Sequence, residues 1–153
     1  PERAEAILTQ ITDTGLTPAR RSTGDPLTDK TQVYLADTLG ETGLWYALSP
    51  LTCLCGSFTP VGGHNPYEPA HAGSAILHGP QYANFAPAYA DLHAARAARE
   101  VTDATILAAE LDTLLSDPAA LDTLRRNART FATAQTDELD AFAETLCKAL
   151  ALR

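Results

Sequence analysis

The sequence predicts an α/β domain with a Rossmann-like, mostly parallel sheet and helices on both faces. Two observations carry this prediction. Short apolar runs typical of strands alternate along the chain with segments of helical periodicity. Residues that cap helices also come directly after two of the strand-like runs. The 153 residues, 45% of them hydrophobic, fit one packed domain of ordinary size, so we expect residues 1–153 to form it.

The sequence pattern of the N-terminal part predicts one helix and two strands. Residues 2–15 carry apolar side chains at helical spacing and end at Gly15, a typical helix stop. Residues 16–22 predict a short strand, and residues 23–30 are rich in Gly, Pro, Asp and Thr and predict a loop. Residues 32–36 predict the next strand.

A first strand-to-helix junction follows over residues 37–41. Thr38 and Glu41 have the spacing of a capping box, which predicts a helix that Pro50 closes.

The second junction is richer in glycine. Residues 51–55 predict a buried strand, and three glycines follow within eight residues from Gly56 to Gly63. Asn65 is expected to cap a helix that has Pro66 first and Glu68 third. Free backbone N–H groups at such a helix start suit an anion such as a phosphate. The alternative is a plain connection between strand and helix, since glycine-rich loops are common there.

The rest of the chain continues the alternation and then becomes helical. Residues 75–78 predict a strand, residues 84–96 a helix and residues 96–101 a weak strand. Helices are expected over about residues 103–153, with new ones starting at Asp117 and at Thr136 or Asp137. Five apolar residues of the last helix are expected to face inward: Leu139, Phe142, Ala143, Leu146 and Leu150.

The charge of the chain excludes some partners. A formal net charge of -8 argues against nucleic acid or an anionic membrane surface as the partner of this segment. No apolar run is long enough to span a membrane, and no signal peptide is recognisable. Residues 31–95 contain no Lys or Arg, so a phosphate bound there needs backbone amides. Arg20 and Arg21 are the nearest cations.

The three cysteines indicate free thiols in a reducing compartment. Cys53 and Cys55 would share one side of a strand. A metal site that combines them with His64, His71 or His78 is disfavoured, because the spacing fits no zinc pattern. We therefore predict no metal ligands.

Three loops follow predicted strands, over residues 37–41, 56–68 and 79–85. Because ligands of parallel sheets bind beyond the carboxyl ends of the strands, we expect these loops to meet at one edge and form a ligand site.

In order and spacing, these loops resemble the C-terminal half of the 3-deoxy-D-manno-octulosonic acid (Kdo) transferases, which are GT-B glycosyltransferases. The likeness covers nearly the whole chain, and its most specific part is the string Gly-Gly-His-Asn-Pro-Tyr-Glu-Pro over residues 62–69. Pro1-Glu2-Arg3 is similar to the end of a family segment, so the first strand of the fold is expected to be trimmed. Cys55 stands where glycine is usual in the family. Gln81 stands where histidine is common, which puts a donor role there in doubt.

The resemblance implies that the parent enzyme moves Kdo from CMP-Kdo to a lipid A precursor, at the cytoplasmic face of the bacterial inner membrane. It implies that this segment binds the donor CMP-Kdo, without another cofactor. It also implies that the catalytic carboxylate, the acceptor and the membrane contact belong to the other domain, so that the segment alone is inactive. Two alternatives are the donor domain of a GT-B enzyme that uses a UDP-sugar and a noncatalytic α/β interaction domain.

The resemblance also implies donor contacts for eleven residues: Arg20, Arg21, Gly40, Glu41, Ser57, Gly62, Gly63, His64, Asn65, Glu68 and Asn84. The N–H groups of residues 62–64 would hold the phosphate, and Glu68 would accept from the ribose.

Simpler roles exist for several of these residues. Glu41 and Glu68 could serve capping boxes alone. For Asn84 the main expectation is that it caps the following helix, and donor contact is the alternative. Arg20 and Arg21 could be a solvated charge pair.

Overall fold

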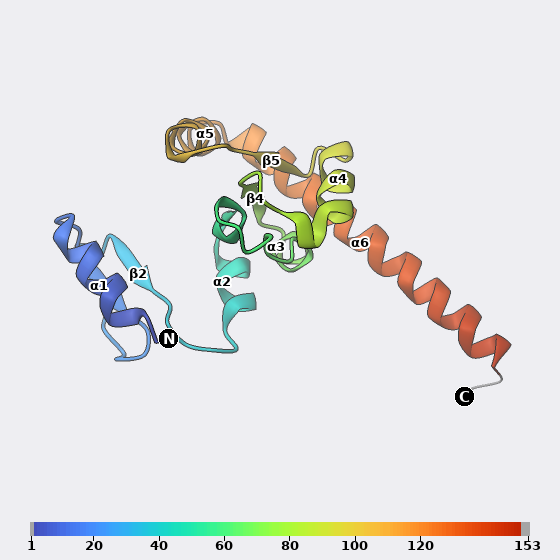
Figure 1. Ribbon diagram of the computed structural model, residues 1–153, viewed down its shortest axis with the longest axis horizontal. Helices are drawn as coiled ribbons and strands as arrows, with labels where there is room; N and C mark the ends of the chain where they lie inside the picture. Colours follow the sequence, from blue (N-terminus) through green and yellow to red (C-terminus); the bar gives the residue numbers. More distant parts are fainter. Residues whose placement is uncertain (1, 151–153) are drawn as a thin grey trace. The chain divides into compact units, whose positions relative to one another are not determined.

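The computed structural model describes residues 2–150 and divides the chain into two compact units, Pro1–Thr42 and Gly43–Arg153 (Figure 1). We call them the N-terminal unit and the C-terminal unit and describe each by itself. Each unit contains a sheet whose strands pair in parallel, with two strands in the first and three in the second. The predicted α/β class with parallel sheets and surrounding helices is therefore confirmed.

The N-terminal unit contains one helix and one strand pair. Helix α1 covers Ala4–Asp13, and strands β1 (Pro18–Arg20) and β2 (Val33–Leu35) pair in parallel. The predicted helix and strands are present, although both strands are shorter than expected. Among residues 2–42, the buried apolar side chains are the small ones of Ala4 and Ala19. So little buried apolar surface leaves polar contacts to hold much of the unit together.

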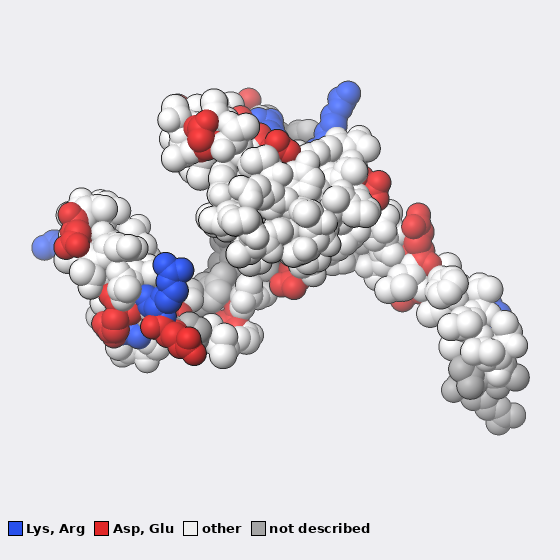
Figure 2. All heavy atoms as spheres, in the orientation of Figure 1, with Lys and Arg blue, Asp and Glu red and all other residues white. Residues whose placement is uncertain are grey.

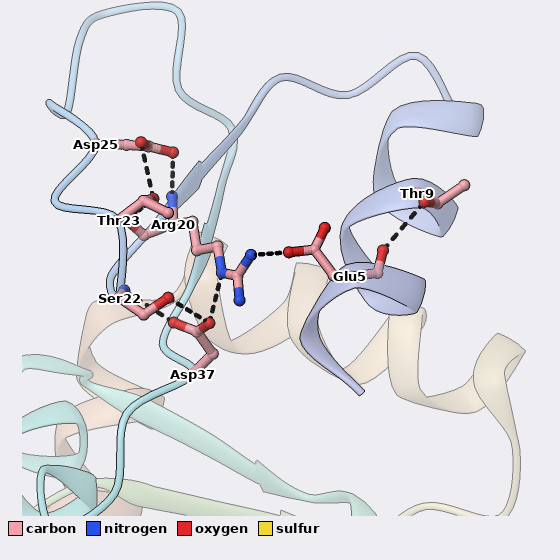
Figure 3. A network of polar contacts seen from close by, with 7 residues as sticks. All are labelled: Glu5, Thr9, Arg20, Ser22, Thr23, Asp25 and Asp37. Atoms are coloured by element: carbon pink, nitrogen blue, oxygen red, sulfur yellow. Dashed lines mark hydrogen bonds and ion pairs between the residues drawn. The ribbon is translucent and has the colours of Figure 1, made fainter. Parts of the chain in front are cut away.

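A network of polar contacts connects the elements of this unit (Figure 3). Arg20 Nε donates to Asp37 Oδ2 at 2.5 Å, and its Nη1 donates to Glu5 on α1. Ser22 donates to the same Asp37 carboxylate through its N–H and its hydroxyl, at 2.9 and 2.7 Å. Burial alone would raise the pKa of Asp37, but the hydrogen bonds from Arg20 and Ser22 outweigh it and hold that pKa well below its usual range.

The C-terminal unit is built around a parallel sheet with the strand order β3-β4-β5. Its strands cover Leu51–Leu54, Ala75–His78 and Ala98–Glu100. All four residues of the central strand β4 are buried. A central parallel strand is covered on both faces, which explains why its sequence is apolar without alternation.

One face of the sheet packs on three helices. Ile76 of β4 lies in a buried cluster with side chains from α3 (Tyr67–Ala72), α4 (Ala86–Ala94) and α6 (Pro118–Ala149). Tyr89 of α4 is fully buried in this cluster.

The opposite face of β4 packs on the C-terminal helices. Leu77 lies in a second cluster with Leu114 of α5 (Ala104–Ser116) and Leu124 of α6. Asp117 caps α6 by accepting hydrogen bonds from two N–H groups of its first turn, as predicted for a helix that starts there. Helices therefore cover both faces of this sheet, as expected.

The predicted break near residue 136 is wrong. Helix α6 runs without interruption from Pro118 to Ala149. Thr136 lies inside it, and its hydroxyl donates to the carbonyl of Ala132 one turn earlier instead of capping a new helix. The five residues expected to face inward are all exposed, with 65% exposure for both Leu139 and Phe142. Their helical spacing predicted the stripe correctly, but spacing does not show what covers it.

The first capping prediction is also wrong in detail. Helix α2 covers Thr42–Leu48, so Glu41 precedes the helix and is not its third residue. Glu41 instead accepts a hydrogen bond from the Thr38 hydroxyl.

Charge is distributed unevenly over the molecule. Figure 2 shows charged side chains gathered on the N-terminal unit and a visible face of the C-terminal unit, around α3 and α4, that is mostly uncharged. Within residues 2–150, no helix combines the length and the apolar content needed to cross a membrane.

Candidate ligand-binding loops

Two of the three predicted loops meet at the carboxyl edge of the β3-β4-β5 sheet. Ser57 joins them from a short 3-10 helix, η1, which covers Cys55–Phe58 and begins directly after β3. Its hydroxyl donates to the Leu54 carbonyl at 2.5 Å and accepts from the Gly79 N–H at 2.6 Å. The Gln81 N–H donates to the Ser57 carbonyl at 2.8 Å. Ser57 is fully buried, so the hydroxyl predicted to contact a donor here connects the two loops.

The two loops approach each other so closely that glycine is required. A Cβ atom at Gly79 would lie 2.5 Å from the Ser57 carbonyl oxygen. A Cβ atom at Gly63 would lie 2.9 Å from Cα of Tyr82, and Gly63 has a φ of +87°, which disfavours other residues. These two glycines therefore set the separation of the loops.

Asn84 fixes the tips of the loops together. Its N–H donates to the Gly62 carbonyl at 3.1 Å, and its Nδ2 donates to the Val61 carbonyl at 3.0 Å. It lies in the 3-10 helix η2 (Ala83–Phe85), and no side chain caps η2 or α4. The simpler role considered for Asn84, a helix cap, is therefore wrong.

The glycine-rich loop carries three consecutive unused donors. Within residues 2–150, the N–H groups of Gly62, Gly63 and His64 donate to no other protein atom. The His64 carbonyl accepts from the Tyr89 hydroxyl at 3.0 Å, which connects the loop to the core. The exposed His64 ring lies close against Gly56, so that a Cβ atom at Gly56 would be only 2.3 Å from His64 Nε2. The loop therefore presents backbone donors on a well-supported segment.

Asn65 and Glu68 shape the start of helix α3. Asn65 Oδ1 accepts from the Tyr67 N–H at 3.0 Å, and its Nδ2 donates to Glu68 Oε1 at 3.3 Å. The helix begins at Tyr67, one residue later than predicted, and Glu68 contacts the side chain of Asn65 and not its backbone, so this is no capping box. The Glu68 side chain is exposed, which leaves its carboxylate accessible.

The other four predicted contact residues belong to the N-terminal unit. Arg21 donates to Glu41 through Nη2 at 2.7 Å and through Nε at 3.1 Å. The hydrogen bond from Arg21, with a smaller contribution from Thr38, lowers the pKa of Glu41 to about 2. Arg20 is bonded to Asp37 and Glu5, and Gly40 is exposed with a φ of +81°. Both arginines thus have carboxylate partners in this structure, and their predicted contacts with a donor stay predictions.

Sequence reasoning missed a polar cluster next to the second loop. His78, His93 and Glu100 bring their nitrogen and carboxylate oxygen atoms within 4.8 Å of one another. Burial lowers the pKa of His78. His78 and Glu100 are partners in the β4-β5 register, and that pairing is the signal that could have found them.

The fold and these loops define a Rossmann-like α/β protein with glycine-rich loops at the carboxyl edge of its sheet, where ligands of such folds bind. No protein-family model matches the chain. The Kdo transferase of Bordetella pertussis is 36% identical over 138 residues, which are 88% of this chain and 32% of the relative. A probable mitochondrial Kdo transferase of Arabidopsis thaliana is 33% identical over 130 residues, 82% of this chain and 29% of the relative.

A solved structure is similar over most of the chain. The crystal structure of the C-terminal CMP-Kdo binding domain of WaaA from Acinetobacter baumannii aligns with a TM-score of 0.82 and 34% identity, over 86% of this chain and 68% of that domain. The chain therefore belongs to the Kdo transferase family, and it corresponds to the C-terminal domain. It spans about a third of the length of the two full-length relatives above.

Proposed function

We propose that this chain is the donor-binding domain of a Kdo transferase and binds CMP-Kdo at the two loops joined by Ser57. The observation that carries the proposal is the likeness, in fold and sequence, to a domain described as binding CMP-Kdo. The parent enzyme would move Kdo onto a lipid A precursor at the inner membrane, with the catalytic carboxylate and the acceptor in its other domain.

The unused N–H groups of residues 62–64 support a phosphate contact. A charged phosphate oxygen forms strong hydrogen bonds with backbone donors that are already held in place. The N–H groups are held in place by contacts with Asn84 and Tyr89, so binding costs little ordering of the loop. In a segment without Lys or Arg, such backbone donors are the available means of holding a phosphate.

Glu68 supports a ribose contact. Its exposed carboxylate offers acceptor oxygens, and its bond to Asn65 holds it beside the glycine-rich loop. Carboxylates accept well from paired sugar hydroxyls, which are neutral donors.

Calorimetric titration with CMP and with UDP tests the proposal. We expect CMP to bind weakly, with a Kd in the millimolar range or below, and UDP to bind at least about tenfold less tightly. Amide spectra recorded with CMP should shift first at residues 62–64 and Asn84. The donor domain of an enzyme that uses UDP-sugars would show the opposite order of affinity, and an interaction domain would bind neither nucleotide.

A matched pair of variants tests the role of Glu68. Glu68→Gln should weaken CMP binding about 10- to 100-fold, as expected for the loss of a hydrogen bond to a charged group. Glu138→Gln makes the same change at an exposed position of α6 and should leave binding unchanged. Unchanged affinity in the Glu68 variant would remove the ribose contact from the proposal.

A further inference from the structure

Three polar side chains converge beside the carboxyl edge of the C-terminal sheet. His78 ends β4, Glu100 ends β5, and His93 lies in α4, which connects the two strands. Their candidate ligand atoms lie within 4.8 Å of one another, and no other group of three such residues within residues 2–150 does so. His78 is fully buried, His93 half-buried and Glu100 exposed, so the cluster runs from the core to the surface.

The hydrogen bonds fix the tautomer of His78. Its Nδ1 lies 2.8 Å from the carbonyl oxygen of Gly79, which can only accept, so Nδ1 carries the proton. The lone pair of Nε2 therefore points at Nε2 of His93, 2.8 Å away. A histidine whose Nδ1–H is held by a backbone carbonyl while Nε2 is free to coordinate is the usual arrangement of a metal ligand.

Glu100 is oriented in a similar way. The Tyr82 hydroxyl donates to its Oε2 at 3.1 Å, which leaves the other carboxylate oxygen available. Ligating carboxylates in metal sites commonly accept such a second hydrogen bond. The ring of Tyr82 also packs edge-on against His78, with 5.1 Å between ring centroids, so one residue supports two members of the cluster.

A pair of neutral histidines sharing one hydrogen bond accounts for part of this arrangement. It explains the short distance between the nitrogen atoms and the stacking of the two rings, with centroids 4.9 Å apart. It does not involve the carboxylate of Glu100, which accepts from Tyr82 and ends the neighbouring strand in register with His78.

We propose that His78, His93 and Glu100 form a site for a divalent metal ion of the zinc class. Two imidazoles and one carboxylate are a ligand set of zinc sites that keep a fourth position open. With Zn–N bonds of about 2.0–2.1 Å and tetrahedral angles, the two Nε2 atoms need a separation of about 3.3 Å. The rings therefore have to move apart by about 0.5 Å from their hydrogen-bonded distance.

Binding of the ion would replace the hydrogen bond between His78 and His93 with three metal–ligand bonds. The ion takes the place of the shared proton, which moves through solvent to Nδ1 of His93, so both rings remain neutral. Glu100 is exposed, so the cluster is open to solvent at that side chain, and His93 also lines a surface cavity of about 720 Å³ with Ala98 and Arg99. The positive charge of Arg99 is offset by its ion pair with Glu110.

The ion would connect three elements directly behind the second loop. Gly79, which follows His78, is the residue whose N–H donates to Ser57. A bound metal would therefore hold β4, α4 and β5 together at the base of that loop. This inference does not depend on the proposed CMP-Kdo site, and either can fail without the other.

Titration of the 153-residue chain with Zn²⁺, followed by calorimetry and by thermal unfolding, tests the proposal. We expect one ion per chain and a higher melting temperature with Zn²⁺. Glu100→Gln keeps the size of the side chain, and His93→Gln removes a ring nitrogen. Each should weaken binding at least about 100-fold, as expected when a ligand is lost. His71→Gln, which changes an exposed histidine on α3, should bind as the unaltered chain does.

Thiols are the competing ligands. Cys53 and Cys55 have sulfur atoms 3.9 Å apart, and the side-chain hydrogen bond between them lowers the pKa of Cys55 to about 6. A chain with both Cys53→Ser and Cys55→Ser should keep its affinity for Zn²⁺. The Co²⁺-substituted chain should lack a thiolate charge-transfer band. Loss of binding in the double variant, binding that survives both His93→Gln and Glu100→Gln, or no binding at all would overturn the proposal.

Discussion

The two units of this chain are stabilised by different forces. In the N-terminal unit, a three-residue strand pair and α1 are connected by arginine–carboxylate contacts around Asp37, whose side chain is only 4% exposed. In the C-terminal unit, apolar side chains fill both faces of the sheet, and β4 is buried along its whole length. Ion pairs respond to pH, whereas the burial of apolar side chains does not. The comparison therefore predicts that acid affects the first unit before the second.

The largest expected effect is the loss of a core side chain in the C-terminal unit. Leu77→Ala should lower the free energy of unfolding by about 2–5 kcal/mol, because it leaves a cavity between β4 and the C-terminal helices. Urea unfolding measures the loss. Leu115→Ala, at a 61% exposed position of α5, is the control and should change stability by less than about 0.5 kcal/mol. Similar losses in both variants would contradict the idea that apolar burial dominates this unit.

A smaller effect is expected where the C-terminal unit depends on a neutral polar contact. Ser57→Ala leaves the Gly79 N–H buried without its acceptor and should cost about 1–3 kcal/mol. Because no charge is involved, the loss should be the same at pH 5 and pH 8. A loss that varied strongly with pH would show that this buried contact is coupled to an ionisable group.

The smallest effect is expected from the half-exposed ion pair of the N-terminal unit. The pKa of Glu41 is about 2 in the folded chain and is ordinarily 4.5. The lower value in the folded state means that the Arg21–Glu41 contact contributes its full stability above pH 4.5 and loses it as the pH falls to about 2. The protection of the β1 and β2 amides from exchange, measured relative to the intrinsic exchange rate at each pH, should therefore fall across this window before that of the β4 amides does.

Glu41→Gln provides the control for that prediction. It removes the titrating group, so the loss of protection should become smaller across the same window. The part that remains comes from Asp37, whose pKa is lowered by Arg20 and Ser22. Equal loss of protection in all strands at low pH would contradict the division of forces between the units.

Much of the fold could be predicted from local patterns. The strand at residues 75–78 and its neighbours were recognisable because buried parallel strands are apolar runs bounded by Gly and Pro. The loop at residues 56–68 was recognisable because glycine and capping residues have specific backbone uses. Helix boundaries were less predictable, and the predicted start at Thr136 failed because a threonine hydroxyl can bond within a helix as well as at its start.

The candidate site was predictable only in part, since its contacts join residues far apart in the chain. The sequence indicated Gly62, Gly63 and Asn84 as neighbours of one ligand, and the structure brings these residues together. The sequence pattern placed Ser57 among the same ligand contacts, but in the structure Ser57 is buried between the loops and connects them. The partners of Arg20 and Arg21 were equally hidden, because charge pairing depends on which carboxylates the fold brings near.

The α/β class, the parallel pairing and the family follow from local properties of the sequence, namely hydrophobic periodicity, glycine positions and a specific eight-residue string. Tertiary structure alone decided which polar groups meet. His78, His93 and Glu100 come together because strand register and an intervening helix place them side by side. Contacts of this kind are set by the packing of whole elements, and no spacing along a single segment encodes them.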